Sequence, residues 1–156
     1  MKKLLLVMVV LLCVTGAAFA QDVFASYNEP GDFNIYASVG WWYWPEFSVA
    51  AEWVIGEFEL GTLPFDWGVA ARGGFDVGYG WFGYSVGVLA TLHLGLAVAP
   101  IEFYGSLGVC FNNHVYPINV ASMGGLTWWF SKNMGLLVES GYLGFGYWGV
   151  GLEFKI

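Results

Sequence analysis

The sequence contains very little charge, and most of that charge is negative. Charged residues are 11% of the 156, with five Lys and Arg against twelve Asp and Glu, whereas about a quarter of a typical soluble domain is charged. A formal net charge of −7 offers no basic surface to a phosphate backbone, so nucleic acid is excluded as an expected partner. The shortage of charge also predicts that something other than water covers much of the surface.

Cysteine is scarce too, and long apolar runs are missing after residue 20. The two cysteines are Cys13 and Cys110, and Cys13 lies in the apolar run near the N-terminus. The remaining chain therefore has no intrachain disulfide. Beyond residue 20 no stretch offers the roughly 20 uncharged apolar residues that a transmembrane helix needs. A helical membrane protein is therefore excluded.

The first twenty residues have the pattern of a secretory signal peptide. Lys2 and Lys3 precede an apolar run, and Ala18-Phe19-Ala20 supplies a small-residue cleavage site. A transmembrane helix is the alternative, but Gly16 interrupts the run short of a full span. Without the two lysines the formal net charge falls from −7 to −9. The expected organisation is a cleaved signal peptide over 1–20, a short N-terminal segment over 21–32 and one domain over 33–156.

Hydrophobic residues, at 58% of the chain, alternate with small or polar ones. Between Phe82 and Leu96, for example, Val86 and Val88 share one face while Gly87 and Thr91 share the other. Such alternation is typical of a barrel wall, and a closed barrel is the sheet that satisfies all backbone groups in lipid. We predict an all-β, eight-stranded antiparallel up-and-down transmembrane barrel with both termini periplasmic. Its strands are expected at 33–44, 47–57, 65–75, 82–96, 101–111, 118–130, 134–142 and 148–156.

Aromatic residues, 20% of the chain, gather at the ends of these predicted strands. Trp and Tyr are enriched where a bilayer meets water, so two girdles are expected. The outer girdle is predicted to contain Trp41, Trp44, Trp81, Tyr84, Tyr147 and Trp148. The periplasmic girdle is predicted to contain Trp67, Trp128 and Phe154.

A soluble barrel of the lipocalin type would use the same alternation inside out. The interior of eight strands is only just wide enough for side chains, and the phase rich in Gly, Ser and Ala fits there better than the Trp and Leu phase. That small-residue phase also has few Lys or Glu to face water. The pattern therefore favours the membrane barrel.

The last predicted strand alternates in a specific way. Its outward set is Trp148, Val150, Leu152, Phe154 and Ile156. The chain resembles small outer-membrane barrels of the OmpA and OmpX type, in which such a strand is the signal read by the barrel-assembly machinery. That signal usually ends in Phe, whereas Ile156 stands here. The resemblance implies residence in the bacterial outer membrane, contact with its lipid and with the assembly machinery, and no cofactor. It leaves the oligomeric state open.

Six ionisable residues fall on the predicted inward face. They are Glu52, Arg72, His93, Glu102, Glu139 and Glu153. Charges in a low-dielectric interior are costly unless paired. We therefore expect Arg72 at mid-height between Glu52 and Glu139, closing the lumen by charge-assisted hydrogen bonds. The alternative is that each group is hydrated separately in a wet interior.

A catalytic or metal site is not expected. His93, Glu102 and Glu153 lie toward the predicted periplasmic end, and His114 lies in a predicted outer loop. No H-x-x-H, cysteine pair or dense carboxylate motif accompanies them. The favoured interpretation is a barrel without enzymatic activity, with a structural or interaction role and a closed polar lumen. The alternative is a narrow passive pore for small solutes or apolar compounds, and an enzyme acting on lipid would depend on His93 or His114.

Overall fold

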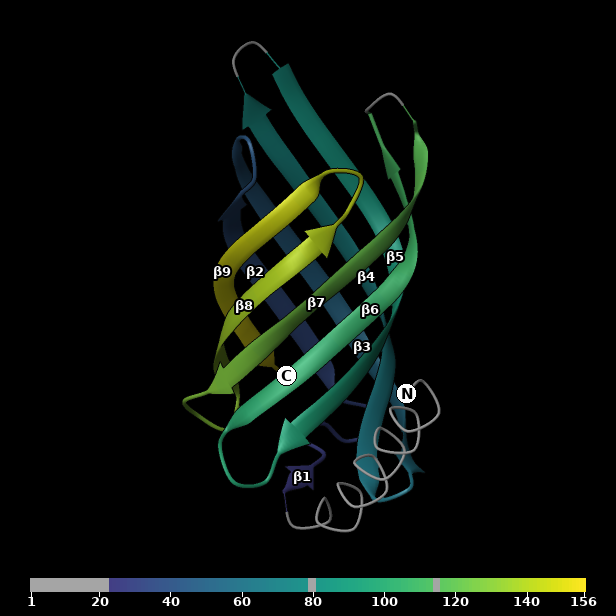
Figure 1. The fold of residues 1–156 in the computed structure, drawn as a ribbon, viewed down its shortest axis with the longest axis vertical. Helices are drawn as coiled ribbons and strands as arrows, with labels where there is room; N and C mark the ends of the chain where they lie inside the picture. Colours follow the sequence, from purple (N-terminus) through teal and green to yellow (C-terminus); the bar gives the residue numbers. More distant parts are fainter. Residues whose placement is uncertain (1–22, 79–80, 114–115) are drawn as a thin grey trace, which may run out of the picture.

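The computed structural model describes residues 23–78, 81–113 and 116–156. These residues form one sheet of nine strands, of which β2 to β9 close on themselves as a barrel (Figure 1). The strands are β1 (Phe24–Ala25), β2 (Phe33–Trp41), β3 (Pro45–Leu60), β4 (Leu63–Gly78), β5 (Trp81–Leu96), β6 (Ile101–Asn112), β7 (Ile118–Trp129), β8 (Met134–Tyr142) and β9 (Gly146–Lys155).

Every strand of the barrel pairs antiparallel with the next one along the chain. The ring closes between β2 and β9, where Ala37 lies opposite Leu152. The predicted eight-stranded antiparallel barrel is thus confirmed. Its predicted strands agree with the observed ones to within a few residues, although β2 ends at Trp41 rather than Trp44. No helix among the described residues is long and apolar enough to span a bilayer.

The two faces of the wall differ sharply in chemistry. Along β5, Val86 and Val88 are exposed, while Ser85, Thr91 and His93 on the opposite face are buried. The other barrel strands repeat this alternation, so bulky apolar side chains cover the outside. An apolar outside around a polar inside is the reverse of a water-soluble protein, and it fits a wall surrounded by lipid.

One end of the barrel is crossed by residues 23–32, which we call the strap. Its β1 pairs with the end of β5, Phe24 opposite Leu96. Its other end joins β3, because the Gly31 N–H donates to the Val54 carbonyl at 2.9 Å and the Val54 N–H donates to the Asp32 carbonyl at 3.0 Å. We call this the strap end. The turns between β3 and β4, β5 and β6, and β7 and β8 lie at this end (Figure 1).

The turn between β8 and β9 lies toward the opposite end, which we call the far end. Leu143 and Phe145 in this turn are buried rather than exposed to solvent. Gly144 between them has a φ of 82° and lies against the Asn112 side chain, a backbone conformation that favours glycine. Each end of the barrel thus has a segment of chain with side chains buried against the lumen, Asn28 in the strap and Leu143 and Phe145 in this turn.

Candidate functional site

The lumen holds most of the ionisable side chains of the barrel wall. Glu52, Arg72, His93, Glu102, Glu139 and Glu153 all point inward and are buried. Alternation places them there, because each stands two or four residues from other inward positions on its strand. The structure therefore brings the six predicted lumen residues to one face of the wall, where five of them form two clusters and Glu153 bonds separately to Thr127.

The first cluster surrounds Arg72. Its guanidinium forms an ion pair with Glu139 and donates through Nε to the Ser48 hydroxyl at 2.9 Å. Glu139 also accepts hydrogen bonds from the Tyr104 and Ser38 hydroxyls. Both charges are buried, and several donors converge on the carboxylate, which is the condition under which a buried pair is tolerated.

The second cluster is centred on His93. Its Nε2 lies 2.9 Å from Glu52 Oε1 and its Nδ1 lies 2.7 Å from Glu102 Oε1. Glu52 accepts further hydrogen bonds from the Tyr36 and Thr91 hydroxyls. His93 is therefore held between two carboxylates on different strands, β3 and β6.

The predicted arrangement of Arg72 between two carboxylates is only partly what the structure shows. Arg72 pairs with Glu139, while Glu52 belongs to the His93 cluster. Tyr104 lies between the clusters, with its ring centroid 5.9 Å from those of both Tyr36 and His93. Alternation along a strand predicts the face of a residue, but partners across the lumen also depend on the tilt and stagger of the strands.

Glycine makes room for these large polar groups. A Cβ at Gly68 would lie 2.8 Å from Glu52 Oε1, and one at Gly125 would lie 2.6 Å from Tyr104 Cε1. The space left between Glu52, Arg72 and Tyr104 is a cavity of about 10 Å³, which is at the lower limit for a single water molecule. The side chains therefore leave little space in this part of the lumen.

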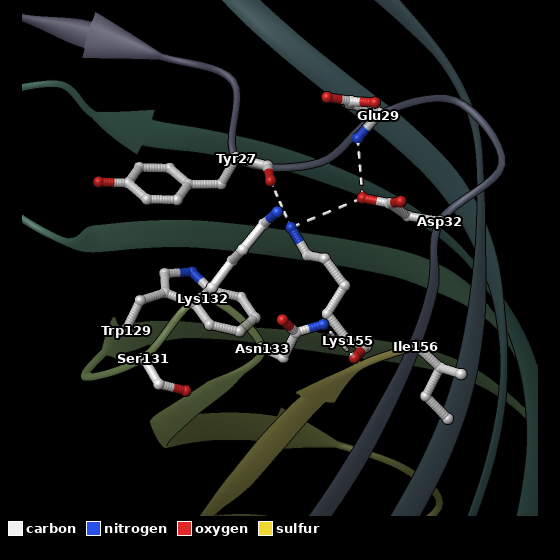
Figure 2. A pocket seen from close by; sticks show the side chains of 9 residues that line it. All are labelled: Tyr27, Glu29, Asp32, Trp129, Ser131, Lys132, Asn133, Lys155 and Ile156. Carbon is white, nitrogen blue, oxygen red and sulfur yellow. Dashed lines mark hydrogen bonds and ion pairs between the residues drawn. The ribbon is translucent and has the colours of Figure 1, made fainter.

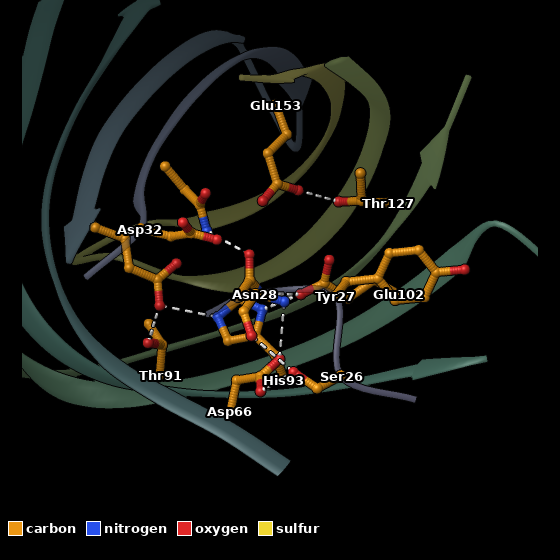
Figure 3. Close-up of polar contacts among 12 residues, drawn as sticks. Ser26, Tyr27, Asn28, Asp32, Asp66, Thr91, His93, Glu102, Thr127 and Glu153 are labelled. Atoms are coloured by element: carbon orange, nitrogen blue, oxygen red, sulfur yellow. Dashed lines mark hydrogen bonds and ion pairs between the residues drawn. The ribbon is translucent and has the colours of Figure 1, made fainter. Parts of the chain in front are cut away.

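The strap contributes polar groups that sequence reasoning missed (Figure 3). Asn28, only 1% exposed, donates through Nδ2 to Glu102 Oε1 at 2.7 Å and accepts from Asn34 Nδ2 at 3.1 Å. The Asn28 N–H and the Ser26 hydroxyl both donate to Asp66. The segment had been expected only to precede the barrel. One signal was available in the sequence: Asp66 stands two residues before the inward-facing Gly68, so its carboxylate could be expected to face the lumen and to need a partner there.

Tyr27 and Trp129 complete the strap end. The Tyr27 hydroxyl donates to the carbonyls of Leu96 and Ala99, both at 2.9 Å. Burial raises the pKa of this hydroxyl, and the charge of Glu102 adds to the shift, so the phenol remains a donor. The Trp129 indole donates to Glu102 Oε2 at 2.7 Å. The strap is thereby tied to the lumen cluster and to the wall.

One part of the network lacks donors. Glu153 accepts from the Thr127 hydroxyl through Oε2, but its Oε1 has no donor among the described residues. Asn34 Oδ1 is likewise without one in that part of the chain. Asn34 lies opposite Lys155, and Tyr36 lies opposite Glu153, so the two acceptors are diagonal neighbours on the inward face of β2 and β9.

The aromatic residues predicted at the membrane boundaries mostly face outward. The exposed ones are Trp41, Trp44, Trp67, Tyr84, Trp128 and Trp148. Phe154 is half-buried, and the side chain of Trp81 lies outside the described part. Tyr147 was wrongly placed in the outer girdle, because it is buried and its hydroxyl donates to Ser38 Oγ at 2.6 Å. It lies on the inward face of β9, whereas the adjacent Trp148 lies on the outward face.

The remaining predicted positions are placed as follows. In β9, Val150 and Leu152 face outward with Trp148, and Ile156 is exposed just beyond the strand. Residues 1–20, predicted as a signal peptide, and His114 lie outside the described residues. Among the described residues, no group of three or more His, Cys, Asp or Glu side chains is arranged to hold a metal ion.

A closed antiparallel barrel of eight strands with an apolar exterior and a polar interior is a transmembrane β-barrel. Solved structures share this fold. The chain superposes on a de novo designed transmembrane β-barrel with a TM-score of 0.62 and 19% identity, covering 83% of this chain and 98% of that one. A second designed barrel, TMB2.3, gives a TM-score of 0.56 and 20% identity over 83% and 97%.

A natural protein has the same fold. The N-terminal β-barrel domain of OprF from Pseudomonas aeruginosa matches with a TM-score of 0.60 and 17% identity, covering 83% of this chain and 100% of that domain. No protein-family model and no curated protein matches the sequence. The chain thus has the fold of the small eight-stranded outer-membrane barrels, and no subfamily is identified.

Proposed function

We propose that this chain is an outer-membrane barrel with a structural or interaction role, whose lumen neither conducts solutes nor carries out catalysis. The observation that supports the proposal is the set of side chains buried in the lumen. Polar side chains occupy its middle, the strap crosses one end, and Leu143 and Phe145 of the turn between β8 and β9 are buried toward the other. The part of the barrel left to interact with its surroundings is the exterior.

A conducting path would have to disrupt the buried ion pairs. The cavity beside Arg72 is about 10 Å³, while a single water needs roughly 10–15 Å³ of such space. An ion passing the middle of the lumen would have to separate Arg72 from Glu139, which would leave two buried charges without their partner. This cost supports a closed barrel over the narrow pore.

The buried polar groups also suit a structural role better than a catalytic one. His93 has a carboxylate oxygen within 3 Å of each ring nitrogen, at 2.7 and 2.9 Å. Glu102 additionally accepts from Asn28 and Trp129. A general base needs a path to its substrate, whereas these groups are engaged with each other beneath the strap.

The exterior supports the proposed location. Apolar side chains such as Val88 and Leu107 are exposed at mid-height, with exposed tryptophans toward the strand ends. Such a band is stable only in lipid, and a bacterial barrel of this kind is assembled in the outer membrane. Outer-membrane lipid is therefore the proposed permanent partner, and the alternating β9 is the proposed signal for the assembly machinery.

Single-channel recording in planar bilayers tests the closed lumen. We expect the refolded protein to be electrically silent. The R72A/E139A double variant, which empties the middle of the lumen, serves as the comparison and is expected to show small openings. Stable unitary conductance from the unaltered protein would refute the closed barrel and favour the narrow pore. Heat-modifiable migration in SDS gels and outer-membrane fractionation separately test the barrel and its location.

A further inference from the structure

A pocket of about 450 Å³ opens at the strap end, outside the filled lumen (Figure 2). Its volume is within the range of small-molecule sites, about 300–1,000 Å³. Three separate pieces of chain form it: the strap, the turn between β7 and β8, and the end of β9. Its polar and charged lining residues are Tyr27, Glu29, Asp32, Ser131, Lys132, Asn133 and Lys155.

The pocket gathers the scarce positive charge of the protein. After residue 20 the chain has only three basic residues, Arg72, Lys132 and Lys155. Arg72 is buried in the lumen and paired with Glu139. Both remaining lysines line this one pocket, and Figure 2 shows their side chains extending into the same space. In a protein with a large excess of acids, two cations converging on one cavity point to an anionic ligand.

The acids nearby neutralise this charge only in part. Lys155 Nζ donates to the Tyr27 carbonyl and lies 5.1 Å from the centroid of the Trp129 ring. Its distance to Asp32 Oδ2 is 3.6 Å, and that oxygen also accepts from the Glu29 N–H at 2.9 Å. The Glu29 carboxylate points away from the lysines (Figure 2). The Asp32 carboxylate is thus shared between Lys155 and the Glu29 N–H, so it compensates the charge of Lys155 only in part.

The positive charge of Lys132 is compensated even less. Its side chain is exposed in the turn between β7 and β8, and it forms no ion pair with a described residue. Ser131 beside it is exposed, and among the described residues its hydroxyl has only a long contact of 3.5 Å to the Met134 carbonyl. One ammonium and one hydroxyl are thus available to a ligand, next to the ammonium of Lys155.

We propose that this pocket binds a phosphate group. A phosphate is compact and offers several acceptor oxygens, which matches two flexible ammonium donors and a hydroxyl. The pocket also lies at the height where lipid phosphates are found, because Trp128 and Phe130 on the neighbouring outer face are exposed as boundary aromatics. The phosphate could belong to a lipid headgroup of the adjacent leaflet or to a free molecule of the aqueous phase.

The test uses the refolded full barrel in an uncharged maltoside detergent. Inorganic phosphate is titrated by calorimetry, and short-chain phosphatidylglycerol is compared with a phosphate-free monoacylglycerol by native mass spectrometry. We expect K132Q and K155Q each to weaken binding about tenfold, since each removes one charge-assisted contact. K132R and K155R are expected to retain binding. E57Q changes the net charge away from the pocket and should leave affinity unaltered.

The possible outcomes distinguish the two sources of the phosphate group from each other and from failure of the proposal. Lysine-dependent binding of inorganic phosphate supports a site open to the aqueous phase, and lysine-dependent binding of phosphatidylglycerol alone supports a lipid headgroup site. Binding of neither probe overturns the proposal, as does binding that K132Q leaves unchanged or that the monoacylglycerol reproduces. Heat-modifiable migration of every variant shows that the barrel has formed, so a negative result here does not bear on the closed lumen.

Discussion

Inside this barrel a charged side chain is stable only through its partners. The Arg72 guanidinium and the Glu139 carboxylate are both buried, and their ion pair is extended by Ser48, Ser38 and Tyr104. The desolvation of two charges is offset by this network rather than by the pair alone. Removing one partner and removing both should therefore have very different consequences.

The first prediction concerns the two halves of this pair. R72M or E139L alone is expected to lower the free energy of unfolding by about 3–5 kcal/mol, because each leaves an uncompensated buried charge. The R72M/E139L double variant is expected to lose much less. Urea unfolding in lipid vesicles, followed by tryptophan fluorescence, measures all three. Additive losses in the double variant would contradict the paired arrangement.

The second prediction concerns Glu153, whose Oε1 has no donor among the described residues. In E153Q the amide can donate to the neighbouring Asn34 Oδ1, while the remaining carbonyl still accepts from Thr127. We expect the free energy of unfolding to rise by about 1–2 kcal/mol, the cost of an unsatisfied buried polar group. E153L is the matched control and should be destabilised, since the Thr127 hydroxyl then loses its acceptor. A destabilised E153Q would show that the charge itself is needed.

At the scale of single elements, the strap differs from the eight strands it closes. The barrel strands form long ladders, whereas the strap is held by two short backbone pairings at its ends and by side chains between them. Asn28 supplies the central contacts, to Glu102, Asn34 and Asp66. An element with few backbone bonds opens locally before the rest of the fold does.

The third prediction follows from this difference. N28A removes the amide that joins the strap to Glu102 and Asn34, and it should increase hydrogen exchange at Gly31 and Val54, whose amides bond across the strap junction. Amides in the middle of β5 should exchange as before. The exposed Glu29 of the same segment provides the control, and E29A should leave exchange unchanged. Equal protection at Val54 in N28A and the unaltered protein would contradict the anchoring role of Asn28.

At the scale of the whole molecule, the sequence was informative wherever alternation alone determines the structure. The strands, the closed barrel and the inward face of all six ionisable lumen residues follow from a period of two. The contacts between side chains across the lumen do not follow from this period. Glu52 was therefore grouped with Arg72, although it contacts His93. The strap was missed because residues 23–32 have no alternation. Tyr147 was placed on the wrong face because an aromatic residue near a strand end can face either side.

The last prediction tests the medium around the barrel. Val88 lies on the outer face of β5 and is 56% exposed. If lipid surrounds it, V88R should lower the free energy of unfolding in vesicles by about 2–4 kcal/mol, the cost of a guanidinium near the bilayer midplane. V88L, which keeps the surface apolar, is the matched control and should have little effect. A soluble barrel would gain solubility from V88R without losing stability, so folding of V88R in buffer without detergent would refute a membrane-embedded wall.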